Sequence, residues 1–448
     1  MNNSLREYFR FPEGYVSLVL PETVLGTEGY FRFDDLVLYG KCKTPFPADS
    51  PTAMGPDALH ATVESGKVCL PFDPARVASN LRHEHYMRPL GSSSVLQGAL
   101  HKAYYFVRPV LPVRVRKWMQ QLYLKDWAKI PFPTWPVDAT VDKLFQRLLW
   151  LALESTGRER IPFIWFWPEG ATSCAILTHD VETERGLASC EAIMDLDDSF
   201  GIRASFQLTP ERRYRVTRAD LEAIRKRGFE VAVQDLNHDG HLFTRRKHFV
   251  ACAAKINAYG RTWGAQGFRA AILYRRQEWF GELHFEYDMS VPSVAHLEPQ
   301  RGGCCTVMPF FIGDILELPV TTAQDYSLFH IFNNYSLDLW KHQCALIMEQ
   351  HGLMSFIIHP DYVRGEREQG VVRSLLAYLT ELRSEQNVWL AMPGEVNRWW
   401  RQRAGMSIVE DAAGIRIEGA GKERARIAYA SRDSGRLAYT FEPQAVAI

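Results

Sequence analysis

The sequence predicts an α/β fold built on a parallel sheet, and three observations in residues 162–403 support this prediction. Short apolar runs alternate with longer amphipathic segments. Glycines such as Gly201, Gly228 and Gly352 stand where the amphipathic segments end. Strand–helix alternation of this kind is typical of a parallel sheet, open or closed into a barrel. Five polar residues also close or follow apolar runs, as at the catalytic rim of a β/α barrel: Asp180, His238, Arg269, Asp288 and His359.

Composition places the chain among ordinary globular proteins. Its 448 residues can bury a large core and leave room for two or three domains. The 52 basic and 52 acidic residues cancel, so no global field recruits nucleic acid. We find no secretory signal and no apolar run of membrane-spanning length. The eight cysteines lack paired spacing, and a reducing cytoplasm is therefore the expected compartment.

Residues 1–100 predict an irregular, β-rich N-terminal region. Apolar runs at 15–20 and 36–39 are broken by Pro and Gly, and four prolines between Thr44 and Pro56 exclude a helix there. His83 and His85 are candidate metal ligands, although isolated surface histidines are much commoner.

Residues 101–161 predict a basic helical connector. Residues 101–130 contain seven basic residues and only one acid, Asp126, and aromatic residues are interleaved with them. Such a helix can lie on an anionic membrane surface. The reading we favour is a helix that packs its aromatic side on the next domain, because its charges do not occupy one clean face. The proline-rich stretch 130–138 then leads into a helix that ends near Thr156.

From Pro162 onward the elements follow in regular order. The helices are expected at 187–200, from a capping box of Thr217 and Asp220 to Arg227, at 245–258, 337–350 and 371–385. The strands are expected at 174–178, 202–208, 230–233, 267–270, 285–287, 315–319, 354–358 and 388–392. Residues 404–448 alternate in short runs and predict a small antiparallel β appendage.

A pair of acids follows the first of these strands, in "ILTHDVE". Asp180 and Glu182 lie two residues apart, so an extended chain places them on one face. A carboxylate pair at this spacing can divide its work, one oxygen donor holding a cation and the other accepting a proton. A pair of solvated acids at the start of a loop has the same spacing.

With "VAVQDLNHDGHLF" and the motifs that follow, the stretch from Pro162 to Arg403 resembles the polysaccharide deacetylase family. That family is also called the NodB-homology domain, or carbohydrate esterase family four. Its ordered motifs are an acid pair, His-x3-His, an Arg strand, an Asp strand and a late His strand, and each has a counterpart here in order. The resemblance implies a distorted (β/α) barrel of the NodB-homology type.

The resemblance also implies roles for the first group of residues. Asp180 resembles the general base that takes a proton from a metal-bound water. Glu182 falls where a carboxylate ligates the metal, although the family usually has Asp there. His238 matches the second histidine of His-x3-His, and Gln234 stands at the first. The implied metal ligands are therefore Glu182, His238 and Gln234.

The remaining motifs imply the other catalytic residues. Arg269 in "GFRAA" resembles the arginine that pairs with the base, with Ala271 in place of the usual proline. Asp288 in "FEYDMS" matches the aspartate that orients the general acid, and His359 in "FIIHPDY" matches that acid. Amide hydrolysis needs such a pair, a carboxylate kept ionised by Arg and an imidazole kept protonated by Asp. Taken singly, Arg269, Asp288 and His359 could equally be structural residues.

The glutamine is the main departure from the family. An amide oxygen is a weak, neutral ligand for zinc-like ions, which prefer imidazole and thiolate. A divalent metal, most simply Zn, is the implied cofactor, and Gln234 should weaken its binding. His241 or His179 are the alternatives that would have to supply the missing imidazole.

Three functions follow from the sequence. The leading one is a metal-dependent hydrolase that removes acetyl groups from amino sugars of a cell-envelope or exported polysaccharide, or of its precursor. The second is a weakened relative that binds carbohydrate without turnover. The third is a component of a polysaccharide assembly system held at the membrane surface through residues 101–130. Aromatic residues near the strand ends either stack on sugar rings or cap the core: Trp165, Trp167, Tyr274, Trp279, Tyr287, Tyr326 and Tyr362.

Overall fold

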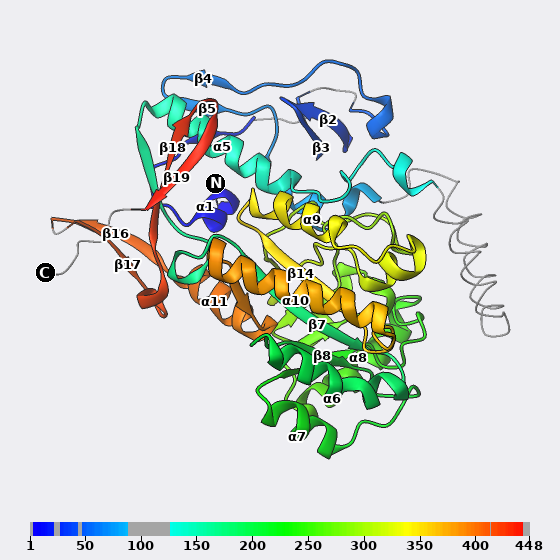
Figure 1. Ribbon diagram of the computed structural model, residues 1–448. Coiled ribbons are helices and arrows are strands. Elements are labelled where there is room, and N and C mark those ends of the chain that lie inside the picture. Colours follow the sequence, from blue (N-terminus) through cyan, green and yellow to red (C-terminus); the bar gives the residue numbers. More distant parts are fainter. Residues whose placement is uncertain (1–2, 22–26, 44–46, 88–125, 413, 442–448) are drawn as a thin grey trace, which may run out of the picture.

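A computed structural model describes residues 3–21, 27–43, 47–87, 126–412 and 414–441 (Figure 1). Most of the basic segment at 101–130 lies outside these residues, and only a short turn at Trp127–Lys129 is described. Within the described ranges, no helix combines the length and apolar character that crossing a membrane requires.

The predicted α/β class is confirmed by a nine-stranded sheet at the centre of the molecule. Its strands run in the order β12-β13-β11-β10-β9-β8-β7-β14, and β15 also pairs with β7. All neighbours are parallel except β12 and β13. The strands are β7 (Cys174–Val181), β8 (Ser205–Leu208), β9 (Glu230–Gln234), β10 (Gly267–Arg269), β11 (Tyr287–Asp288), β12 (Phe310–Ile312), β13 (Ile315–Glu317), β14 (Leu353–Ile358) and β15 (Trp389–Ala391).

The sheet curls into a half-barrel, and the gap between β13 and β14 has no strand ladder across it. Hydroxyl groups bridge this gap instead. Thr321 Oγ1 donates to the Leu353 carbonyl and Thr322 Oγ1 to the Ser355 carbonyl, both at 2.7 Å. The Ser355 amide in turn donates to Thr321 Oγ1 at 2.9 Å. These bonds satisfy carbonyl groups of β14 that would otherwise be left unpaired at a sheet edge.

Helices cover the outer face of the sheet. Successive side chains of a strand point to opposite faces, so each strand can pack apolar side chains both inward and against these helices. In β7, Ile176 belongs to the inner core, which the inner face of the sheet shares with the two ends of the chain. Ala175 and Leu177 belong to the outer core, which the sheet shares with the covering helices. The expected capping box of Thr217 and Asp220 is present. The covering helices are α6 (Glu184–Ser199), α7 (Arg218–Lys226), α8 (Arg246–Trp263), α9 (Asp338–Met348) and α10 (Glu366–Gln386).

The two ends of the chain pack together beside the barrel, above it in Figure 1. Strand β6 (Arg160–Ile164) pairs with β18 of the C-terminal hairpin. The remaining elements are α1 (Asn3–Phe9), β1 (Leu18–Val19), β2 (Gly29–Phe33), β3 (Leu36–Gly40), β4 (Thr62–Glu64), β5 (Lys67–Cys69), α2 (Pro74–Arg82), α5 (Thr140–Thr156), α11 (Pro393–Gly405), β16 (Ser407–Asp411), β17 (Gly414–Glu418), β18 (Ile427–Asp433) and β19 (Arg436–Phe441).

Helix α2 departs from the expected irregular β character of residues 1–100. The Asp73 side chain accepts from the amides of Ala75 and Arg76, and Pro74 occupies the first helical position. Both features favour a helix start, because they satisfy or remove amides that have no partner in the first turn.

A buried carboxylate ties α5 to the N-terminus and to the barrel. Asp142 Oδ1 accepts from the hydroxyls of Thr306 (2.7 Å) and Tyr8 (3.1 Å), and Oδ2 accepts from the Val307 amide (2.9 Å). Burial raises the pKa of Asp142 to about 6, and the hydrogen bonds of these donors oppose that rise. Because the folded pKa exceeds the usual carboxyl value, its stability contribution is present below about pH 4. It is lost as pH rises through 6.

We therefore expect Asp142→Asn to flatten the pH dependence of folding. The amide keeps the shape and can bond to the same hydroxyl groups, but it does not titrate. The wild type should lose on the order of 3 kcal/mol of unfolding free energy between pH 4 and 7 relative to this variant. Urea denaturation at both pH values measures the difference. Parallel curves for the two proteins would show that Asp142 has an ordinary pKa.

Candidate active site

Polar side chains from four strand ends converge at the carboxyl edge of the sheet. Asp180, near the end of β7, lies beside Arg269 at the end of β10. Arg269 Nη1 donates to Asp180 Oδ1 at 2.6 Å and to Thr178 Oγ1 at 2.8 Å, and Nε donates to the Met289 carbonyl at 3.0 Å. The Arg269 side chain is fully buried. The predicted pairing of Asp180 with Arg269 is therefore present.

Gln234, at the end of β9, turns its amide toward the same carboxylate. Its Nε2 donates to Asp180 Oδ2 at 3.0 Å, so both oxygens of Asp180 accept a hydrogen bond. An ionised carboxylate only accepts, which fixes the orientation of the amide. Gln234 Oε1 is buried and has no hydrogen-bond partner among the described residues.

Glu182 lies between two imidazoles at the opening of the site. Its Oε1 is 2.9 Å from His238 Nε2 and 3.6 Å from His359 Nε2. Tyr362 donates its hydroxyl to Glu182 Oε2 at 3.4 Å. The Glu182 side chain is 23% exposed, whereas those of Asp180, His238 and His359 are at most 6% exposed. Glu182 is therefore the carboxylate of the site that a ligand reaches.

The histidine that follows β14 is held by an aspartate that the sequence did not reveal. Asp325 Oδ1 lies 2.6 Å from His359 Nδ1, and its Oδ2 accepts from the His359 amide at 2.7 Å. With Nδ1 bonded to Asp325, Nε2 faces Glu182. Burial disfavours the charge, but Asp325 and Glu182 outweigh it and raise the pKa of His359 well above 6.5. His359 is therefore an imidazolium at neutral pH, the form that a general acid needs.

Asp288 does not take its predicted place beside His359, and this prediction was wrong. Its neighbours Tyr287 and Met289 face the inner core, so Asp288 points to the opposite side of β11. There it accepts from the amide and hydroxyl of Ser290, each at 2.8 Å, and pairs with the buried Glu317. Burial and Asp288 together raise the pKa of Glu317 well above 4.5, so the pair shares a proton. Asp325 is the residue that orients His359.

His238 is placed by a strained loop and by an arginine. Its backbone φ is +52°, a left-handed value that non-glycine residues seldom adopt. Arg213, in the loop after β8, donates from Nε to the Asn237 carbonyl at 3.4 Å and from Nη2 to the His238 carbonyl. The same Nη2 lies 3.3 Å from His238 Nδ1. Both ring nitrogens of His238 therefore have neighbours, Glu182 on one side and Arg213 on the other.

The three implied metal ligands do not fit a metal ion as a set. Gln234 offers only a neutral amide oxygen in place of an imidazole, and Nε2 of His238 faces Glu182 at close range. A metal-binding histidine normally donates its second ring N–H to an acceptor, whereas Nδ1 of His238 faces the guanidinium donor of Arg213. Across the described ranges, no three His, Cys, Asp or Glu side chains are arranged to hold a metal ion.

The alternative histidines do not supply a ligand either. His179 lies on the opposite face of β7 from Asp180, fully buried, and its Nε2 is 2.8 Å from Asp197 Oδ2. His241 is exposed, and its Nδ1 lies 3.5 Å from Asp239 Oδ1. In the N-terminal region, His83 Nδ1 bonds to the Ser79 carbonyl and His85 Nδ1 to Asn80.

The aromatic residues named from the sequence divide between the two expected roles. The inner core buries Trp165, Trp167 and Tyr287. Tyr326 and Tyr362 are half-buried beside the site, with ring centroids 5.7 Å apart. Tyr362 also lies 4.8 Å from the His359 ring. An apolar ring face next to Glu182 and His359 suits stacking against a sugar.

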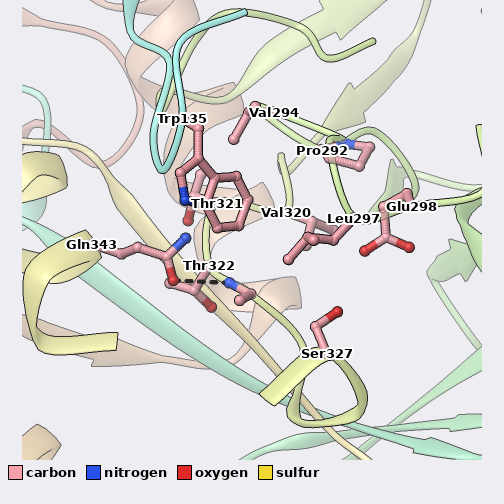
Figure 2. A pocket seen from close by; sticks show the side chains of 11 residues that line it. Trp135, Pro292, Val294, Leu297, Glu298, Val320, Thr321, Thr322, Ser327 and Gln343 are labelled. Atoms are coloured by element: carbon pink, nitrogen blue, oxygen red, sulfur yellow. Dashed lines mark hydrogen bonds between the residues drawn. The ribbon is translucent and has the colours of Figure 1, made fainter. Parts of the chain in front are cut away.

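A small cavity adjoins the loop that carries Asp325, as Figure 2 shows. Trp135 covers one side of it, and Gln343 Oε1 accepts from the Ala323 amide at 3.0 Å along another. Its volume is about 20 Å³, enough for about one water and too small for a sugar ring. The cavity is therefore not the substrate site.

Solved structures share a partial likeness with this chain. A proposed polysaccharide deacetylase from Mycobacterium smegmatis is 17% identical, with a TM-score of 0.43 over 53% of this chain and 93% of that one. Puue allantoinase is 12% identical, with a TM-score of 0.41 over 52% and 92%. Peptidoglycan deacetylase PdaC from Bacillus subtilis is 13% identical, with a TM-score of 0.34 over 51% and 93%. No known family profile and no curated protein matches the chain. Likenesses this low carry no conclusion about activity.

Proposed function

We propose that this protein is a carbohydrate deacetylase that removes acetyl groups from amino sugars of a polysaccharide or its precursor. The observation that carries the proposal is the pair of Glu182 and His359, 3.6 Å apart, at the opening of the site. A carboxylate and an imidazolium at this separation can together accept and donate the protons of amide hydrolysis. The ordered motifs that resemble polysaccharide deacetylases support the choice of substrate, as does the ring of Tyr362 beside both groups.

The proposed reaction uses only side chains. Glu182 accepts a proton from water as the water oxygen forms a bond to the acetyl carbonyl carbon. His359 donates its Nε2 proton to the sugar nitrogen as the carbon–nitrogen bond breaks. Acetic acid, which keeps the second hydrogen of the water, and a free amine leave, and the proton on Glu182 returns to His359 across the 3.6 Å gap. Asp325 holds the imidazole throughout.

The chemistry should be slow, because Glu182 is a weak base. Burial opposes its charge, but His238 and His359 outweigh that effect and lower the pKa of Glu182 well below 4.5. A base is most effective when its pKa lies near the working pH. Since the implied ligands do not fit a metal ion, no step of the proposal uses one.

Mass spectrometry of a panel of N-acetylated and O-acetylated oligosaccharides tests the proposal. We expect products that are one acetyl group lighter from N-acetylated substrates. Intact substrates after prolonged incubation, despite measurable binding, would instead favour the second candidate, a carbohydrate-binding protein without turnover. One observation favours that candidate: Arg269 and Gln234 occupy both oxygens of Asp180, the residue expected to be the base.

Tyr362 gives a test of sugar binding that does not depend on turnover. We expect Tyr362→Ala to weaken oligosaccharide binding by about three- to tenfold, because stacking on an aromatic ring contributes roughly 0.5–1.5 kcal/mol. Tyr362→Phe keeps the ring and should bind almost normally. Titration calorimetry with both variants makes the comparison. Equal losses in the two would assign the effect to the hydroxyl and its bond to Glu182.

The membrane-surface role remains a proposal that depends on residues 101–130. Seven basic residues within this segment would favour anionic lipid. We expect the protein to sediment with anionic liposomes at low salt and to stay in the supernatant with neutral liposomes. If the protein stays in the supernatant with both lipids, the membrane-surface role is rejected. The expected compartment is then the cytoplasm, as the cysteines predict.

A further inference from the structure

Arg213 makes three contacts with the loop that presents His238. Its Nε and Nη2 donate to the carbonyls of Asn237 and His238, and Nη2 lies 3.3 Å from His238 Nδ1. The two carbonyl bonds fix the guanidinium in place. They also stabilise a segment in which Asp235 and His238 both have left-handed backbone angles, a conformation that costs energy for residues with a side chain. The position of Arg213 against the ring is therefore built into the loop.

This contact determines which nitrogen of His238 carries hydrogen. A guanidinium donates and never accepts, so Nδ1 has to offer its lone pair to Arg213. In a neutral ring the hydrogen then sits on Nε2, which lies 2.9 Å from Glu182 Oε1. A histidine that binds a metal through Nε2 has the opposite arrangement, with a lone pair on Nε2 and a hydrogen on Nδ1.

We infer that Arg213 is a positioning residue: it leaves Nδ1 of His238 without the acceptor that a metal-bound imidazole needs, and it thereby keeps a divalent metal ion out of the site. Two departures then act together, since Gln234 stands in place of one imidazole and Arg213 places a donor against Nδ1 of the other. The inference rests on the proposed function only in its account of metal-free chemistry. Its test measures metal binding and ring protonation. The role of Arg213 can therefore be refuted while the proposed deacetylation holds, and the proposed deacetylation can be refuted while the role of Arg213 holds.

Zinc titration of four variants tests the inference, with Zn²⁺ alone as the probe. The proteins are the wild type, Gln234→His, Arg213→Ala with Gln234→His, and Arg212→Ala with Gln234→His. Arg212 is the matched control, because it is exposed and lies 3.9 Å from Asp239 rather than against His238. We expect the Arg213 double variant to bind zinc roughly ten- to a hundredfold more tightly than Gln234→His, the usual effect of a metal ligand's hydrogen-bond partner. The Arg212 double variant should match Gln234→His.

Nitrogen-15 spectra of the His238 ring give a second readout that does not need a variant to fold or bind. At a pH high enough for the ring to be neutral, we expect hydrogen on Nε2 and none on Nδ1 in the wild type, and in Arg213→Ala a shift of hydrogen toward Nδ1. Hydrogen on Nδ1 of the neutral wild-type ring would overturn the inference. Stoichiometric zinc in the wild type would do so as well, as would equal zinc affinity of Gln234→His with and without Arg213. If no variant binds zinc, the wild-type spectrum alone decides.

Discussion

Replacing His359 by glutamine is expected to lower kcat for deacetylation by roughly a hundred- to ten-thousandfold, the usual contribution of general acid–base catalysis. Glutamine fills a similar volume and its amide can still donate to Asp325, so the loop should keep its shape. It has no proton to give to the leaving nitrogen. A steady-state assay of acetate release, at a pH where both proteins are folded, measures the loss.

The pH profile of the wild type checks the same role. Asp325 and Glu182 raise the pKa of His359 well above 6.5, so the acid should remain protonated through neutral pH. His238 and His359 lower the pKa of Glu182, so the base should remain ionised well into the acid range. The rate should therefore form a broad plateau and decline only above neutral pH. A decline centred near pH 6.5 would mean that His359 has an ordinary pKa and that Asp325 does not tune it.

Replacing Arg269 by methionine is expected to lower the free energy of unfolding by about 3–5 kcal/mol, the cost of leaving one partner of a buried ion pair unpaired. Asp180 would keep its bond from Gln234 but would have no counter-ion in a site where it is 4% exposed. Guanidinium denaturation of the purified variant measures this cost.

A double variant separates the charge from the packing. In Arg269→Met combined with Asp180→Asn, the buried charge is absent and an amide oxygen still accepts from Gln234. We expect the double variant to recover at least half of the lost stability, which is a coupling of 1.5 kcal/mol or more between neighbouring residues. Simple addition of the two single effects would mean that the ion pair contributes nothing, and that the loss comes from the bonds of Arg269 to Thr178 and Met289.

Residues at strand ends were predictable because hydrophobic runs identify the strands, and parallel strands bring their carboxyl ends to one edge. In the structure Glu182 lies beside His238 and His359, and Asp180 lies beside Arg269 and Gln234. The prediction was wrong for Asp288, although alternation along "FEYDMS" carried a usable signal. Tyr287 and Met289 are large and apolar, so the acid between them has to point to the opposite face of the strand.

Residues contributed by irregular loops were not predictable. Asp325 lies in the segment after β13, where no periodic pattern specifies the direction of a side chain. Arg213 belongs to a loop with several arginines, and only the fold shows which of them meets His238. The N-terminal helix α2 did have a local signal in Asp73 and Pro74, which the broken apolar pattern around it obscured.

The central claim is that Glu182 and His359 hydrolyse an acetylated sugar without a metal ion. The most direct measurement is acetate release by protein stripped with a chelator, before and after zinc is added back, with His359→Gln in parallel. We expect the same slow rate in both wild-type samples and a rate at background in the variant. Release that appears only when zinc is restored would contradict the claim.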